Sequence, residues 1–176
     1  MSDKYKTETD KLYYVTITVV GWVDVFTRKE YVFDLMENIK YCQTNKGLDL
    51  YAYVIMSNHL HLIARSTDVP LNILLGNFKS YTSKKLIEMI DTNSRESRKE
   101  WMMRMFNYYG TGNSQNVEYQ FWQNGNHPIG LWNPKVIQQK IDYLHNNPVK
   151  QGIVAKPEDY LYSSANEFSE IKVLTM

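Results

Sequence analysis

Two histidines separated by a single residue are the first feature of the sequence that could do chemistry. His59 and His61 flank Leu60 in the run HLHLIAR, which follows the turn-type pair Ser57-Asn58. If this run is a strand, both imidazoles project from the same face, because strand side chains alternate. Two such imidazoles can hold one divalent cation and leave coordination positions open. Taken alone, the spacing is explained more simply by two hydrogen-bonded or exposed histidines beside a turn.

The run KIDYLHNNPVK, residues 140–150, contains a second candidate set. In a helix, Tyr143 and Asn147 are four residues apart and lie on one face. A tyrosine phenol can attack phosphorus once a nearby charge offsets its ordinary pKa of about 10. The oxygen of a carboxamide can add a hard ligand to a metal held by two histidines. Alternatively, Tyr143 packs in the core and Asn147-Pro148 only ends the helix.

The elements that would position these side chains follow from hydrophobic periodicity. Strands are predicted over residues 11–22, 48–56, 59–65 and 117–123, and helices over 28–45, 70–91 and 134–146. Residues 92–112 predict a further helix and loop, with a flexible loop over 110–116. The central βαββαβ order predicts an α+β fold: a ferredoxin-like antiparallel sheet with helices on one face, plus a C-terminal helix that carries the tyrosine. We expect a single domain over residues 1–176, with a core of about 12–150 and a tail over 151–176.

Composition narrows the class of protein. The chain has 176 residues, of which 43% are hydrophobic and 22% charged, which excludes disordered and fibrous proteins. The single cysteine, Cys42, excludes an intrachain disulfide and a multi-cysteine zinc site. No apolar run approaches the ~18 residues of a membrane span, and the polar start predicts no signal peptide, so we expect a cytoplasmic protein. The net charge of +1 argues weakly against a nucleic-acid-binding protein. Residues 76–156, however, carry 11 Lys/Arg against 6 Asp/Glu. This local excess of positive charge is typical of a phosphate-binding face, and also of an ordinary solvated face.

Two blocks of the sequence resemble the single-tyrosine transposases. The first, MSNHLHL at 56–62, is similar to their Met-Pro-Asn-His-hydrophobic-His-Leu signature. Ser57 stands at the proline position, and either residue suits a tight turn. The second block resembles the REP-associated branch and consists of Trp122-Gln123, DYLHNNPVKQG at 142–152, PEDY at 157–160 and SSA at 163–165. The resemblance runs from about Leu12 to Phe168.

This resemblance implies a metal-dependent, nucleoid-associated enzyme that nicks and joins single-stranded DNA beside hairpins. His59, His61 and Asn147 would bind Mg²⁺ or Mn²⁺, and Tyr143 would form a 5′-phosphotyrosine link. Because each chain has one such tyrosine, transposition implies either a homodimer or strand exchange. The alternative is a domesticated relative that binds hairpin DNA or RNA without cutting it. A hydrolase of small phosphate esters is a third candidate, although no carboxylate near the motifs is an obvious general base.

Basic and aromatic side chains in the second half of the chain are the predicted DNA contacts. The cations could bind phosphates, Trp122 could stack an unpaired base, and His127 could approach the metal or shape a turn. A solvated helix face and a buried tryptophan explain these residues nearly as well. The predicted contacts are Lys79, Lys84, Lys85, Arg95, Arg98, Lys99, Arg104, Trp122 and His127.

Overall fold

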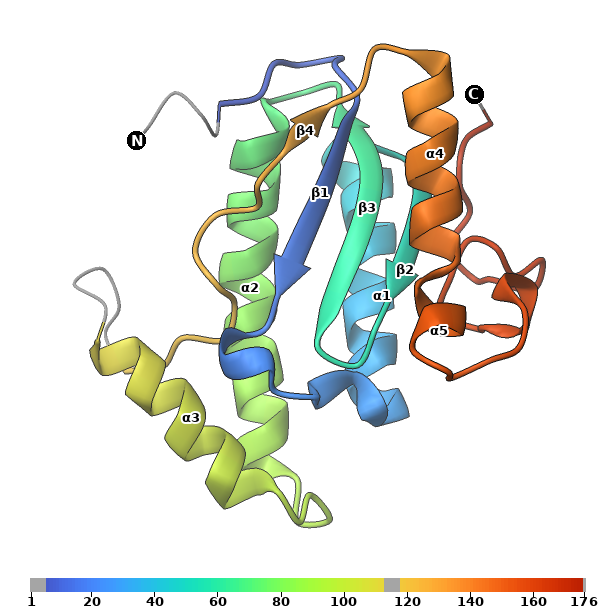
Figure 1. The fold of residues 1–176 in the computed structure, drawn as a ribbon. Coiled ribbons are helices and arrows are strands. Elements are labelled where there is room, and N and C mark those ends of the chain that lie inside the picture. Colours follow the sequence, from blue (N-terminus) through green and yellow to red (C-terminus); the bar gives the residue numbers. More distant parts are fainter. Residues whose placement is uncertain (1–5, 113–117, 176) are drawn as a thin grey trace.

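A four-stranded antiparallel sheet organises the computed structural model, which describes residues 6–112 and 118–175 (Figure 1). The sheet has the strand order β2-β3-β1-β4. β2 and β3 form a hairpin, and β1 pairs antiparallel with both β3 and β4. The strands are β1 (Tyr13–Thr18), β2 (Leu48–Ile55), β3 (His59–Ser66) and β4 (Ile129–Gly130). The predicted α+β class with an antiparallel sheet is confirmed.

Strand β1 is built from β-branched and aromatic residues whose side chains alternate between the two faces of the sheet. Val15 and Ile17 face the main core, whereas Tyr14 faces the opposite side. β1 ends at Thr18, earlier than the predicted strand over 11–22. Its pairing stops there because a short 3₁₀ turn, η2 (Val20–Trp22), follows with Gly21 at a φ of +60°.

Helices α1 (Lys29–Asn45) and α2 (Leu71–Thr92) cover one face of the sheet (Figure 1). Their buried residues recur at helical spacing, as in Leu35, Met36 and Ile39 of α1. Pro70 directly precedes α2, where its fixed φ suits a helix start. Helix α3 (Lys99–Thr111) adds Met102 and Phe106 to the same core. No helix in the described ranges is both long enough and apolar enough to span a bilayer.

Helix α4 (Pro134–His145), the helix predicted in addition to the βαββαβ unit, lies on the other face of the sheet. The side chain of Asn133 caps its first turn by accepting hydrogen bonds from the backbone nitrogens of Lys135 and Val136. Leu144 is fully buried in a second cluster with Tyr14, Val54, Met56 and other residues. This cluster exists because alternate strand residues also present apolar side chains on this face. Helix α5 (Asn147–Lys150) follows at once.

The strand predicted over 117–123 is wrong. Val117 lies outside the described residues; over 118–123 only Trp122 forms a bridge, an isolated one to Val19, and the fourth strand of the described sheet is the short β4. Phe121 and Trp122 are adjacent yet both buried, whereas a strand would turn one of them to the opposite face. Both rings pack around Phe26, which fixes this segment as irregular chain. The flexible loop predicted over 110–116 lies partly outside the described residues; its first residues, Gly110 and Thr111, still belong to α3.

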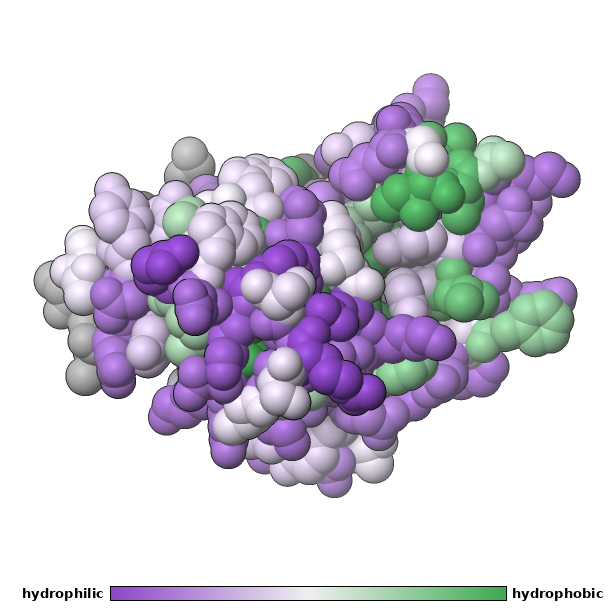
Figure 2. Space-filling model, turned by 90° about the horizontal axis from the view of Figure 1, so that it is seen from below, coloured by the Kyte–Doolittle hydropathy of each residue, from purple (hydrophilic) through white to green (hydrophobic). Residues whose placement is uncertain are grey.

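The C-terminal tail covers the free edge of β2. Backbone hydrogen bonds join Ile55 to Tyr162, Tyr53 to Ser164 and Leu50 to Leu174. The tail contains one 3₁₀ turn, η4 (Pro157–Asp159), and exposes the large apolar side chains Ile153, Leu161 and Phe168. Seen from below, apolar side chains gather on the right, the side on which α5 and the tail lie (Figure 2).

Candidate active site

His59 and His61 lie side by side on the face of the sheet that α4 covers. β3 pairs with β1 so that His59 is opposite Thr18 and His61 opposite Thr16. The alternation of strand side chains places both imidazoles on one face, with ring centroids 4.8 Å apart. Both residues are buried. Ligands for a shared cation would therefore be held by a rigid strand pair.

Asn58 orients the imidazole of His59. Its amide nitrogen donates hydrogen bonds to Oδ1 of Asp24 at 2.8 Å and to the backbone oxygen of Trp22 at 3.3 Å. Its amide oxygen therefore faces Nδ1 of His59, at 2.7 Å. Because a carbonyl oxygen only accepts, Nδ1 of His59 must carry the proton, and Nε2 keeps a lone pair for a metal.

His61 is held by two hydroxyl groups. Its Nδ1 lies 2.8 Å from the Tyr14 hydroxyl and 2.8 Å from Oγ1 of Thr16. Burial, helped by the charges of His59 and Lys140, lowers the pKa of His61 to about 3. Burial also lowers the pKa of His59, and Asp24 opposes that shift. Both rings are therefore neutral near pH 7, the form that binds metals.

Helix α4 brings Tyr143 to this pair. The Tyr143 ring centroid lies 6.1 Å from that of His61 and 6.4 Å from that of Tyr14. The ammonium of Lys150 lies 4.6 Å from the centre of the Tyr143 ring, and that of Lys140 lies 5.8 Å away. Two positive charges are therefore available to a phosphate that approaches this phenol.

Tyr14 and Tyr143 differ in their suitability as nucleophiles. The Tyr14 hydroxyl is engaged by His61, and burial raises the pKa of Tyr14 to about 12. Tyr143 is 44% exposed, so a DNA strand can reach it. Of these two neighbouring phenols, Tyr143 is the one suited to attack a phosphate, whereas Tyr14 is suited to position His61.

Asn147 follows Tyr143 by four residues in the sequence, and its side chain is buried. Its amide nitrogen donates to the backbone oxygen of Tyr143 at 3.0 Å and to that of Leu144 at 3.5 Å. Neither bond uses its carboxamide oxygen, the atom that a metal would bind. Its role as the third ligand stays a prediction.

Comparison with known proteins identifies the family. A family model described as "Transposase IS200 like" matches residues 9–124, well over half of the chain, including both histidines. The chain belongs to the IS200-like transposase family. The matched stretch of the chain ends before α4, so Tyr143 lies outside it.

One solved structure extends the likeness over most of the transposase. It is described as "Structure of the REP associates tyrosine transposase bound to a REP hairpin", and it is similar with a TM-score of 0.53 and 17% sequence identity. The alignment covers 93% of this chain and 82% of that chain. At this identity the likeness shows a shared fold. No curated protein matches the transposase sequence.

The donor set suits an ion that accepts nitrogen and neutral oxygen ligands. Within residues 6–112 and 118–175, no group of three or more His, Cys, Asp or Glu side chains is arranged to hold a metal. An ion at this site would be held by His59 and His61, and its remaining ligands would be amide, water or phosphate oxygens. Neutral imidazoles with a fixed ring orientation fit Mn²⁺, and Mg²⁺ less tightly.

Two of the predicted DNA contacts, Lys79 and Lys99, form hydrogen bonds within the chain. The ammonium of Lys79 donates to the backbone oxygens of Gln123 and Gly125 and to Oδ1 of Asn126, and burial lowers the pKa of Lys79 to about 8. Lys99 donates to the backbone oxygen of Asp91. The other contacts proposed from sequence are exposed or partly exposed: Lys84, Lys85 (which pairs with Asp34), Arg95, Arg104 and His127, the last with a φ of +42°.

Trp122 is not a surface ring. It is 4% exposed, and its indole nitrogen donates to Oγ1 of Thr82 at 3.0 Å. This matches the alternative that Trp122 is a buried tryptophan at the end of a segment, and the burial does not favour the stacking of a base on its ring.

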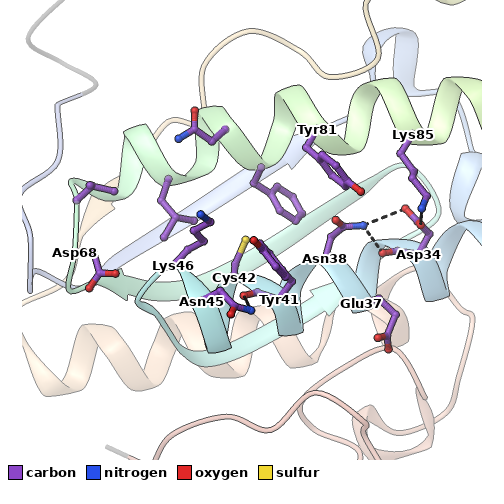
Figure 3. A pocket seen from close by; sticks show the side chains of 14 residues that line it. Asp34, Glu37, Asn38, Tyr41, Cys42, Asn45, Lys46, Asp68, Tyr81 and Lys85 are labelled. Atoms are coloured by element: carbon purple, nitrogen blue, oxygen red, sulfur yellow. Dashed lines mark hydrogen bonds and ion pairs between the residues drawn. The ribbon is translucent and has the colours of Figure 1, made fainter.

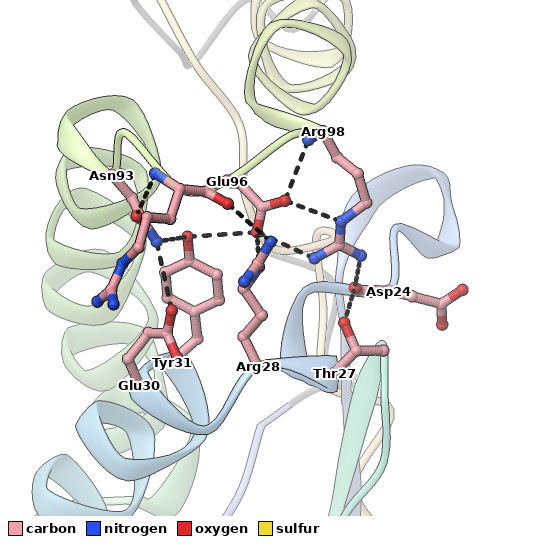
Figure 4. A network of polar contacts seen from close by, with 9 residues as sticks. Asp24, Thr27, Arg28, Glu30, Tyr31, Asn93, Glu96 and Arg98 are labelled. Carbon is pink, nitrogen blue, oxygen red and sulfur yellow. Dashed lines mark hydrogen bonds and ion pairs between the residues drawn. The ribbon is translucent and has the colours of Figure 1, made fainter.

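Arg98 belongs to a buried ion network rather than to a free surface (Figure 4). Glu96 accepts hydrogen bonds from Nε of Arg28 at 2.6 Å and from Nε of Arg98 at 3.0 Å. Burial alone would raise the pKa of Glu96, but the hydrogen bonds from Arg98 and Arg28 outweigh it and lower this pKa to about 2. Arg98 also donates to the backbone oxygen of Asp24, the residue whose carboxylate holds Asn58. The network therefore supports the segment beside His59.

The cavity between α1 and α2 lies apart from the histidine–tyrosine site (Figure 3). It has a volume of about 830 Å³, and its lining includes Asp34, Tyr41, Tyr81 and Lys85. None of His59, His61 and Tyr143 lines it.

Sequence reasoning missed the residues that support the pair. Tyr14 and Thr16 could have been found, because they alternate along a strand predicted to lie in the same sheet. Lys140 and Lys150 lie within one helical turn or two of Tyr143 and were also detectable. Asp24 and Trp22 carry no such signal, because only the tertiary turn brings them to His59.

Proposed function

We propose that this chain nicks and joins single-stranded DNA through a covalent link to Tyr143. The observation that supports this proposal is the meeting of two neutral imidazoles with an exposed phenol, at centroid distances of 4.8 Å (His59 to His61) and 6.1 Å (His61 to Tyr143). Membership of the IS200-like transposase family is consistent with it.

We infer that the sheet is a ferredoxin-like one whose fourth strand has shortened to two residues, with α4 as the added helix that carries the tyrosine. The strand order β2-β3-β1-β4 supports this assignment. The substrate would be a single strand with a hairpin, by analogy with the similar transposase that was solved with a REP hairpin.

Nε2 of His59 and the free nitrogen of His61 would hold Mg²⁺ or Mn²⁺, with Asn147 as the proposed third ligand. Such an ion, when bound, would polarise the scissile phosphate and offset charge on its oxygens. The protein's own contribution is to keep both imidazoles neutral and to fix their orientation through Asn58, Tyr14 and Thr16.

The covalent step needs no nucleotide cofactor. The Tyr143 hydroxyl loses its proton, its oxygen bonds to phosphorus, and the P–O3′ bond breaks, so that the departing 3′ oxygen gains a proton. The products are a 5′-phosphotyrosine and a free 3′-hydroxyl. Because the number of phosphoester bonds is unchanged, a 3′-hydroxyl of another strand can reverse the step and join DNA.

The test is the covalent adduct itself. A labelled hairpin-bearing single strand is incubated with the protein and Mn²⁺, and protein–DNA species that survive SDS are counted. Tyr143→Phe should abolish the adduct, whereas Tyr81→Phe, at an exposed tyrosine of α2, should leave it unchanged. Equal adduct from Tyr143→Phe would overturn the assignment.

The two alternative functions, a non-catalytic hairpin binder and a phosphate-ester hydrolase, predict different results. EDTA-insensitive hairpin binding without adduct under any metal would identify a non-catalytic binder. Turnover of a small phosphate ester by Tyr143→Phe would indicate a hydrolase that uses water.

A further inference from the structure

Trp22 presents a large ring to solvent beside the proposed metal site. Its side chain is 59% exposed, and its ring centroid lies 5.8 Å from that of His59, with the rings at 75°. The exposed indole offers a flat apolar surface next to the imidazoles, on which a ligand bound at this site could pack.

The backbone holds this ring in place under strain. Gly21 and Trp22 have φ angles of +60° and +55°, a left-handed region that bulky residues rarely adopt. The Trp22 nitrogen donates to Val19, and the Trp22 oxygen accepts from Asn58, the residue that orients His59. Strain of this kind persists where the surroundings enforce it, and it gathers at functional sites.

Helix α3 locks the same turn from the other side. A Cβ at Gly21 would lie 2.9 Å from Cε of Met105 and 3.0 Å from Cε2 of Tyr109, so the turn has no room to relax toward α3. The turn that carries Trp22 is therefore packed against α3 through Gly21, while the exposed indole itself lies beside the ring of His59.

We propose that Trp22 stacks on an unpaired base of the nucleotide next to the phosphate that Tyr143 attacks. This inference rests on the proposed function and deepens it by assigning a base-binding position. Every base offers a flat π-face to an indole, but only an unpaired, splayed base can use it, which selects single-stranded over duplex DNA. One sugar separates a base from its own phosphate, so a base on Trp22 belongs to a nucleotide beside His59.

Fluorescence of 2-aminopurine placed singly at positions around the cut tests the stacking. With Tyr143→Phe as the uncleaving parent, at least one position should be quenched on binding, and adding Trp22→Gly should remove that quench. Trp22→Gly should weaken binding of the single strand about 5- to 150-fold, the equivalent of 1–3 kcal/mol for one stacked base. Trp22→Phe, which keeps a ring, should restore most of both signals. Trp132→Gly, at an exposed tryptophan ahead of α4, is the matched control and should change neither.

Thermal stability separates stacking from a structural role. Glycine adopts a φ of +55° freely, so Trp22→Gly relieves strain and should keep the melting temperature within roughly 4 °C of the parent. The proposal is overturned if Trp22→Gly changes neither the quench pattern nor the affinity for DNA. It is also overturned if Trp22→Gly loses DNA binding because it is unfolded, and Trp22→Phe restores folding without restoring the quench. If the wild-type protein forms no adduct, the proposed function fails, yet the quench is still read in the Tyr143→Phe background.

Discussion

At the scale of single residues, the site is defined by groups that fix the imidazoles rather than by the imidazoles alone. His59 has one amide partner, Asn58, and His61 has two hydroxyl partners. The shared face of the two histidines was predictable, because the period of a strand is local geometry. Their proximity to Tyr143 was not, because it depends on how α4 docks on the sheet. The resemblance named the tyrosine, but it carried no information on Tyr14, Asp24 or Trp22.

Removing the amide that orients His59 should weaken metal binding. Asn58→Ala leaves Nδ1 of His59 without its acceptor, so the ring and its tautomer are no longer fixed, and Mn²⁺ affinity should fall about 10- to 100-fold. Isothermal titration with Mn²⁺ measures this. Ser57→Ala is the control, because Ser57 bonds the same Asp24 carboxylate without touching the imidazole. Equal affinity of Asn58→Ala and the parent would show that Asn58 does not position the ligand.

At the scale of elements, buried polar groups join segments that the sequence leaves unconnected. The carboxylate of Glu96, in the α2–α3 connection, binds Arg28 at the start of α1. Lys79 ties α2 to the chain that follows Trp122. Helices α1 and α2 were predictable because their apolar spacing is regular. The chain over 118–123 was mispredicted because aromatic residues that alternate with polar ones look like a strand, even where the adjacent rings of Phe121 and Trp122 fill one core.

The Glu96 network should make stability depend on pH in a defined window. The pKa of Glu96 is lower in the folded state, about 2, than in the unfolded state, so its stabilisation is complete above pH ~5 and is lost as the pH falls toward 2. Glu96→Gln should cost up to about 3 kcal/mol of unfolding free energy at pH 7. Urea unfolding at several pH values should show this difference shrinking in acid. Glu100→Gln, on the exposed side of α3, serves as the control, and a difference that stays constant down to pH 2.5 would contradict the prediction.

Lys79 and Lys84 form a matched pair on α2. Lys79→Met removes the ammonium that donates hydrogen bonds to three oxygen atoms, and it should lower the unfolding free energy by roughly 1–3 kcal/mol. Since the ammonium of Lys79 is bound to oxygens of the protein and not to a DNA phosphate, the salt dependence of hairpin binding should be the same in Lys79→Met as in the parent. Lys84→Met should do the reverse, with little effect on stability and a log–log salt slope reduced by about one if Lys84 contacts a phosphate. Binding titrations at four salt concentrations check both, and a reduced slope for Lys79→Met would contradict its internal role.

At the scale of the whole molecule, one chain brings the histidines and the tyrosine together. His59 and His61 come from the hairpin, and Tyr143 comes from a helix that crosses the opposite face from α1 and α2 (Figure 1). The sequence could not distinguish this arrangement from one in which a partner subunit supplies the tyrosine, because the distance between these segments is a property of the folded chain.

Mixing two inactive variants tests whether the site is assembled within one chain. Tyr143→Phe and His61→Ala each lack one half of the site. If each chain uses its own tyrosine, as the 6.1 Å separation of the His61 and Tyr143 rings indicates, the mixture should form no adduct. Refolding the two proteins together ensures exchange of subunits. Adduct at a quarter or more of the wild-type amount would show that the tyrosine acts on a partner's histidines.

The position of α4 in the chain has a consequence for synthesis in the cell. Translation delivers the imidazole pair first and the phenol much later, after every strand of the sheet has been made. A nascent or prematurely terminated copy that stops before α4 would have His59 and His61 but neither Tyr143 nor Asn147, the proposed nucleophile and the proposed third ligand. On the proposed function, the chain can cut DNA only after the ribosome has finished α4 and α5 and these helices have docked on the sheet.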